Sequence, residues 1–199
     1  MMTEILCPDG SINEMLALAG NDEPAALARI EALLGEHPDD PRLHFMKGSL
    51  LAAQERYAEG RIAMRHAVEL APGYDIARFQ LGLLELSSGD AEAADATLQP
   101  LADASDESAL SLFALGLRHL ARDNFEQADA LLRRGIEINV EHPLVSRDME
   151  LMLAGIADAR AKAAADMHRP TSDAEPDAGA DVSAAHLLLQ RYADKSTKH

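Results

Sequence analysis

The chain has 199 residues, of which 47% are hydrophobic, but only 4% are aromatic and tryptophan is absent. The abundant Ala, Leu, Glu and Arg favour helices, and little remains from which sheets could be built. The formal charge of −16, from 34 acidic and 18 basic residues, argues against nucleic acid or an anionic membrane as a partner, because both are bound mainly through Lys and Arg.

The amino-terminal stretch "MMTEILCPDG" and the cysteine content point to a reducing compartment. Cys7 is the only cysteine in the sequence, which excludes an intramolecular disulfide and a thiolate metal cluster. The stretch has no basic residue and no apolar run as long as that of a signal peptide. No segment approaches the ~20 apolar residues of a membrane span. We therefore expect a cytoplasmic protein with a flexible N-terminus at residues 1–9.

Hydrophobic spacing near the helical period predicts a succession of helices separated by short breaks. The breaks contain residues that tolerate tight turns, as in "SSGD" and "ARDN", or a proline that stops a helix, as in "APG" and "EHP". Pro100 falls inside one of these helices and should kink or shorten it. In chain order the predicted helices span residues 11–19, 23–35, 41–53, 57–70, 75–88, 91–103, 108–121, 125–138 and 144–167.

The helices repeat with a fixed period, since the spacings of Phe45, Phe79 and Phe113 are 79 − 45 = 34 and 113 − 79 = 34. Other columns of the same register hold either small residues or large apolar residues. Two helices of a hairpin approach closely only at small side chains, and one hairpin cannot bury both of its faces, so neighbouring hairpins must stack. Glu14 occupies the glycine column of the first row, where we expect looser contact. The columns are Gly48, Gly82 and Gly116; Ala26, Gly60, Ala94 and Ala128; and Ile30, Met64, Leu98 and Leu132.

Together with Tyr57 and Phe125, which open second helices, and Pro38 and Pro72, which close rows, these columns resemble the tetratricopeptide repeat, a helix–turn–helix unit of 34 residues. The resemblance covers about residues 10–142. It implies an all-α fold, a right-handed solenoid of about four helical hairpins with a C-terminal capping helix and a flexible acidic tail. The usual first-helix aromatic is replaced, row by row, by His44, Arg78 and Leu112.

The expected organisation is a single solenoid followed by a tail. The solenoid covers residues 10–167, the segment "TSDAEPDAGAD" has the composition of a linker, and "VSAAHLLLQRYADK" is a candidate amphipathic helix. The segments are the rows 10–38, 41–74, 75–107 and 108–142, the capping helix 143–167, the acidic linker 168–181 and the tail 182–199.

In tetratricopeptide-repeat proteins the first helices line the concave face, so the resemblance implies that the three phenylalanines form a ladder along an apolar groove. A groove of this kind would hold a peptide or an amphipathic helix of a partner protein. The alternative is that the rings pack between adjacent repeats and meet no ligand. The predicted groove residues are Arg42, Phe45, Ser49, Ile76, Phe79, Leu83, Leu110, Phe113 and Leu117.

The tail carries its own apolar residues and could occupy a groove in the same molecule or in a neighbouring one. A linker of about a dozen residues reaches roughly 20 Å on average, and tethering raises the effective concentration to about the mM range. Alternatively, the tail helix lies in solvent or against the cap. The residues of this possible contact are Leu187, Leu188, Leu189 and Tyr192.

Motifs that carry chemistry are absent from the sequence. The eight histidines are scattered without the His-Glu-x-x-His spacing of zinc proteases, and there is no phosphate-binding loop and no Gly-x-Ser-x-Gly elbow. The stretch "DAEPDAGAD" lacks the glycine and the closing glutamate of a calcium loop. We therefore expect no catalytic residues, no cofactor and no metal site.

The sequence thus favours a non-catalytic adaptor or scaffold that binds a protein partner. Two other functions stay open. One is a small acidic chaperone of the secretion type that protects a hydrophobic client. The other is a structural subunit of a larger complex, which would use its convex face or its cap as the contact surface.

Overall fold

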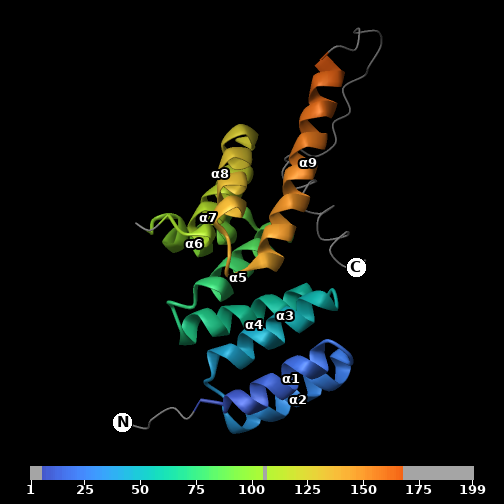
Figure 1. Ribbon diagram of the computed structural model, residues 1–199, viewed down its shortest axis with the longest axis vertical. Coiled ribbons are helices and arrows are strands. Elements are labelled where there is room, and N and C mark those ends of the chain that lie inside the picture. Colours follow the sequence, from blue (N-terminus) through green and yellow to red (C-terminus); the bar gives the residue numbers. More distant parts are fainter. Residues whose placement is uncertain (1–5, 105–106, 168–199) are drawn as a thin grey trace. The chain divides into compact units, whose positions relative to one another are not determined.

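The computed structural model describes residues 6–104 and 107–167, apart from the side chains at 159 and 162–167 (Figure 1). In this part of the chain all regular structure is helical. The helices are α1 (Asp9–Ala19), α2 (Glu23–Glu36), α3 (Pro41–Ala53), α4 (Tyr57–Leu70), α5 (Asp75–Ser87), α6 (Ala91–Ala102), α7 (Ala109–Leu120), α8 (Phe125–Ile138) and α9 (Pro143–Met167).

The helix ends agree closely with those expected from turns and prolines. The largest difference is at α1, which begins at Asp9 rather than at residue 11. Pro100 lies inside α6, which ends two residues later at Ala102 and is shorter, at 12 residues, than the 14-residue α4. Proline has no N–H to donate to the preceding turn, and the helix ends within one turn of it.

Side-chain caps fix the starts of several helices. Asp22 Oδ1 accepts a hydrogen bond from the N–H of Ala25 at 3.0 Å, and Asp90 Oδ1 accepts one from the N–H of Ala93 at 3.2 Å. Ser108 caps α7 in the same way. Each cap satisfies an N–H group that has no partner within the helix, which places the boundary at that residue.

Within the hairpins, the small-residue columns lie where two helices touch. A Cβ built at Gly48 would come within 3.0 Å of the carbonyl oxygen of Gly60, so α3 and α4 approach backbone to backbone. In the first hairpin Glu14 is exposed, and the adjacent Met15 takes the buried position against Ala26 and Ile30. A charged side chain cannot occupy the tight contact, so the neighbouring residue fills it.

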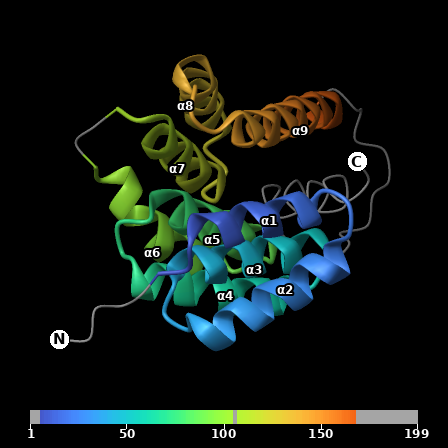
Figure 2. The ribbon, with the colours of Figure 1, turned by 60° about the horizontal axis from the view of Figure 1, so that its bottom comes forward.

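The chain divides into two compact units, Met1–Leu84 and Glu85–His199, with the boundary inside α5. In the first unit α1 packs on α2, α2 on α3 and α3 on α4, as Figure 2 shows. In the second unit α6 packs on α7, α7 on α8 and α8 on α9. No helix in the part of the chain that the structure describes is both long and apolar enough to cross a bilayer.

Candidate interaction surface

The expected groove residues of the first unit keep part of their surface. Phe45 is half-buried, and its ring meets that of Tyr74 edge to face, with centroids 5.3 Å apart. Ser49 is also half-buried, and its Oγ donates a hydrogen bond to the carbonyl oxygen of Phe45 at 3.0 Å. Ile76, at the start of α5, is half-buried as well. These side chains offer a small amount of accessible apolar surface.

The prediction that Phe79 and Phe113 form an exposed ladder was wrong, because both rings are 0% exposed. Phe113 lies against α8, where a Cβ at Gly135 would come within 2.6 Å of its Cδ1. The ring therefore fills the space that the missing side chain leaves open. Leu83, Leu110 and Leu117, which were expected in the same groove, are buried with exposed fractions of 5%, 9% and 0%.

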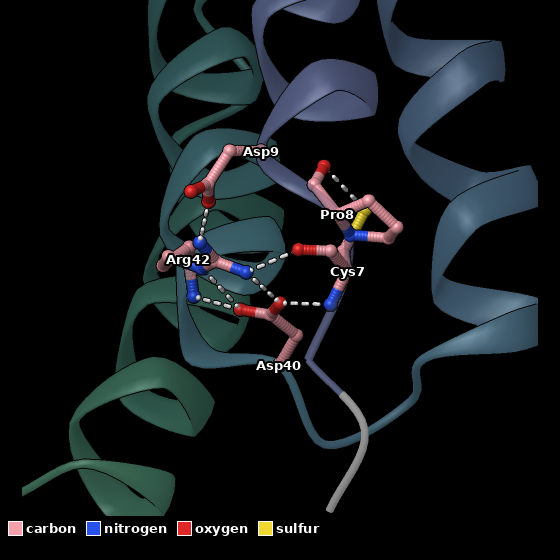
Figure 3. A network of polar contacts seen from close by, with 5 residues as sticks. All are labelled: Cys7, Pro8, Asp9, Asp40 and Arg42. Carbon is pink, nitrogen blue, oxygen red and sulfur yellow. Dashed lines mark hydrogen bonds and ion pairs between the residues drawn. The ribbon is translucent and has the colours of Figure 1, made fainter.

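Arg42 is also not available for a partner, because its guanidinium is held within the first unit (Figure 3). It donates hydrogen bonds to Asp40 Oδ2 at 2.7 Å, to Asp9 Oδ1 at 2.8 Å and to the carbonyl oxygen of Cys7 at 2.6 Å. Asp40 Oδ2 in turn accepts a hydrogen bond from the N–H of Cys7 at 2.8 Å. The first turn of α3 thus fixes the amino-terminal segment.

Burial and hydrogen bonds together set the pKa values in this amino-terminal latch, which consists of Cys7, Asp9, Asp40 and Arg42. Burial alone would raise the pKa of Asp40, but the hydrogen bonds from Arg42 and Cys7 outweigh it and hold the pKa below its ordinary value. Burial raises the pKa of the Cys7 thiol. The thiol therefore stays protonated and packs with Leu33 as an apolar group.

The large apolar side chains exposed in the second unit gather at the junction of α8 and α9. We call this set the α8–α9 strip; its members and their exposed fractions are Ile138 at 37%, Val140 at 87%, Leu144 at 75% and Leu151 at 37%. Leu144 and Leu151 lie two turns apart on the same side of α9. Single exposed apolar residues are common, but a set that follows one helix end is a candidate contact surface.

The strip continues the expected groove register into α9, since 144 − 110 = 34 and 151 − 117 = 34. Leu110 and Leu117 are buried, whereas their counterparts one period later are open to solvent. These residues were not among those predicted, because residues 143–167 were expected only as a capping helix. The 34-residue spacing of the predicted groove residues does extend one row further, from Leu110 to Leu144 and from Leu117 to Leu151.

The corner that carries the strip is fixed by Asn139, which follows the last residue of α8. Its Nδ2 donates to the carbonyl oxygen of His142 and to Ser146 Oγ, both at 2.7 Å, and its Oδ1 accepts from the N–H of His142 at 3.1 Å. The opposite side of α9 is buried; its core residues are Val145, Met149, Met152, Leu153 and Ile156. These contacts hold Leu144 on the outer side of the helix.

Two further expectations concern chemistry and the tail. Among the residues that the structure describes, no group of three or more His, Cys, Asp or Glu side chains is placed to hold a metal ion. The tail residues Leu187, Leu188, Leu189 and Tyr192 lie outside the described residues.

Comparisons with known proteins agree with this architecture. Residues 41–74 match the family model described as Tetratricopeptide repeat. Tetratricopeptide repeat protein 34 of Homo sapiens is 36% identical over 122 residues, which cover 59% of this chain and 22% of the human protein. The chain therefore spans much less than half of that relative.

Two solved structures show the same fold. MamA from residue 41 to its end, from Desulfovibrio magneticus RS-1, has a TM-score of 0.57 and 14% identity, and the match covers 94% of this chain and 92% of that one. A tetratricopeptide repeat protein from Parabacteroides merdae ATCC 43184 has a TM-score of 0.60 and 14% identity, with 94% and 73% covered. At this identity the likeness concerns the fold alone.

The helical hairpins and the matched structures define an all-α helical-repeat solenoid, a class of protein that generally binds other proteins. Residues 41–74 therefore form a tetratricopeptide repeat, and the human relative is named for the same repeat.

Proposed function

We propose that the chain is a non-catalytic adaptor that binds an apolar peptide or helix of a partner protein on the α8–α9 strip. The observation that supports this most is the contrast between Leu144, which is 75% exposed, and Leu110, its buried counterpart one period earlier. A continuing stack would cover Leu144 with another element. In this chain the position is open, so a partner can supply the missing contact.

The spacing of the strip specifies the form of the partner. Leu144 and Leu151 are seven residues apart, about 10 Å along α9. An amphipathic helix with apolar anchors seven residues apart presents the same separation and can lie along this side of α9. The net charge of −16 favours a segment that is neutral or basic, and it fits a cytoplasmic protein partner better than a polyanion.

The expected affinity is modest. Covering the four strip residues would gain on the order of 4–8 kcal/mol at ~1.5–3 kcal/mol for each fully buried side chain, reduced for the part that is already covered. Association itself costs about 4–15 kcal/mol. The strip alone therefore supports a transient complex, and a stable one requires further contacts with the partner.

The experiment compares capture of partner proteins by the wild type and by two matched variants. Leu144→Asp alters a strip residue that is 75% exposed, and Ile62→Asp alters an equally apolar residue that is 69% exposed on α4, in the other unit. Mass spectrometry of the captured proteins should identify a partner that the wild type and Ile62→Asp retain and Leu144→Asp loses. Equal capture by all three would contradict the proposed surface.

A further inference from the structure

We propose that α9 pairs with the α9 of a second copy of this chain, antiparallel and along its exposed side. This inference rests on the proposed function, because both use Leu144 and Leu151, and it names one helix that fits them. Six exposed residues carry the contact, and we call them the outer row. They are Leu144, Arg147, Leu151, Ala154, Asp158 and Ala161.

The outer row lies on the side of α9 that faces away from the core. Its members follow one another at alternating steps of three and four residues, which is the spacing of the seam in a two-stranded coiled coil. Each residue turns the helix by about 100°, so the row falls about 180° from the buried side, which is marked by Val145, Met149 and Ile156. The row runs about 26 Å along α9, and a second helix can lie against it over that length.

Antiparallel pairing about the middle of the outer row sets large side chains against small ones. Leu144 then lies opposite Ala161 of the second copy, and Leu151 lies opposite Ala154 of the second copy. Facing positions that alternate large and small side chains let two helices interdigitate at the usual separation of about 8–10 Å. The arrangement has the two-fold symmetry of a closed dimer, in which each of these contacts occurs twice.

The same register brings opposite charges together. Arg147 lies opposite Asp158 of the second copy, and by symmetry Asp158 lies opposite Arg147 of the second copy. A parallel pair would instead set Arg147 against Arg147 and Asp158 against Asp158, and like charges at facing positions repel. A shift of the antiparallel register by seven residues separates the two charges. Charge complementarity therefore selects one orientation and one register, which supports a second copy as the occupant.

The charge of the helix is compatible with self-pairing. Although the whole chain carries −16, residues 143–162 contain three basic and three acidic residues, so the segment that meets its copy is neutral. A single pair of helices is at the small end of protein interfaces, so the dimer should be weak and its fraction should rise with concentration. A foreign partner helix would compete with the second copy for the outer row.

Sedimentation velocity of the full chain at increasing concentration tests the pairing. Arg147→Asp places two pairs of like charges in the symmetric dimer, and Asp158→Arg does the same with the opposite sign. Each variant should weaken dimerisation about tenfold or more, because repulsion replaces an attraction at two places. The double variant, Arg147→Asp with Asp158→Arg, only exchanges the two charges, so it is the matched control and should dimerise as the wild type does.

An equimolar mixture of the two single variants tests the contact between different molecules. In a mixed dimer every aspartate of one variant faces an arginine of the other, so mixing should restore the dimer that each variant alone forms poorly. A wild type that stays monomeric up to about 1 mM would overturn the inference. So would single variants that dimerise as the wild type does, or a double variant or a mixture that does not recover.

The two proposals fail separately. If the wild type stays monomeric but Leu144→Asp still loses a foreign partner, only the self-pairing fails. If the charge variants behave as expected but the capture of foreign partners is unchanged in Leu144→Asp, only the proposed function fails.

Discussion

The ring of Phe113 lies directly over Gly135, where a Cβ would come within 2.6 Å of the Phe113 Cδ1 atom. This contact joins α7 to α8 inside the second unit and explains why the ring is 0% exposed. In this repeat, therefore, the phenylalanine of the 34-residue column packs in the interior of the protein. One period later, on α9, the corresponding position of Leu144 is 75% exposed.

Gly135→Ala should destabilise the protein. Crowding a packed ring costs about 1–3 kcal/mol, and the better helix propensity of alanine returns at most ~1 kcal/mol. Gly35, close to the end of α2, has nothing within 4 Å of its Cβ position, so Gly35→Ala is the matched control and should leave stability unchanged or raise it slightly. Denaturant unfolding measures both. Equal stabilities for the two variants would show that Phe113 does not press on α8.

The amino-terminal latch predicts the reactivity of the single thiol. Arg42→Ala removes charge-assisted hydrogen bonds to Asp40, Asp9 and the carbonyl oxygen of Cys7, each worth about 1.5–3 kcal/mol. Local opening of the amino-terminal segment should then be ten to a hundred times more frequent, which is on the order expected from that range of free energy.

The rate of Cys7 modification by a thiol reagent reports this opening, because no other cysteine contributes to the signal. Arg56→Ala is the control, since it breaks only an exposed pair with Glu59 in which the atoms are 2.7 Å apart. We expect Arg42→Ala to react at least tenfold faster than Arg56→Ala, by the same range for a charged hydrogen bond. Similar rates would mean that the latch does not hold the segment.

His44 makes stability depend on pH near neutrality. Burial lowers its pKa below 6.5, although the carbonyl oxygen of Pro38, 2.6 Å from Nε2, opposes this shift. The charges of Lys47 and of His66, whose ring centroid lies 4.4 Å away, also lower the pKa of His44, and the charge of Asp39 raises it. The unfolded chain therefore binds more protons than the native one between the lowered pKa and 6.5.

It follows that the free energy of unfolding falls as the pH drops below 6.5 and levels off below the native pKa of His44. The loss is at most about 1.4 kcal/mol for each pH unit of that window. Unfolding midpoints measured from pH 8 to pH 5 should show a shallower decline for His44→Gln than for the wild type. Parallel curves would assign the pH dependence to other groups.

The sequence predicted the helices well because their ends are set locally, by prolines such as Pro72 and by caps such as Asp90. The close contact of Gly48 with Gly60 also followed from the repeat spacing. The direction of Phe113 did not, because it depends on Gly135, a residue of the next helix that the register alone does not relate to the ring. The exposure of Leu144 depends on which element follows α9, and that is a property of the assembled fold.

The α8–α9 strip is tested most directly by the affinity of a captured partner for the wild type, Leu144→Asp and Ile62→Asp, measured by calorimetric titration of the full chain. Leu144→Asp should weaken binding by about tenfold or more, which corresponds to ~1.4 kcal/mol, because a charge replaces an anchor in the contact. Ile62→Asp should bind as the wild type does. If Leu144→Asp binds as tightly as the wild type, the α8–α9 strip is not the recognition surface.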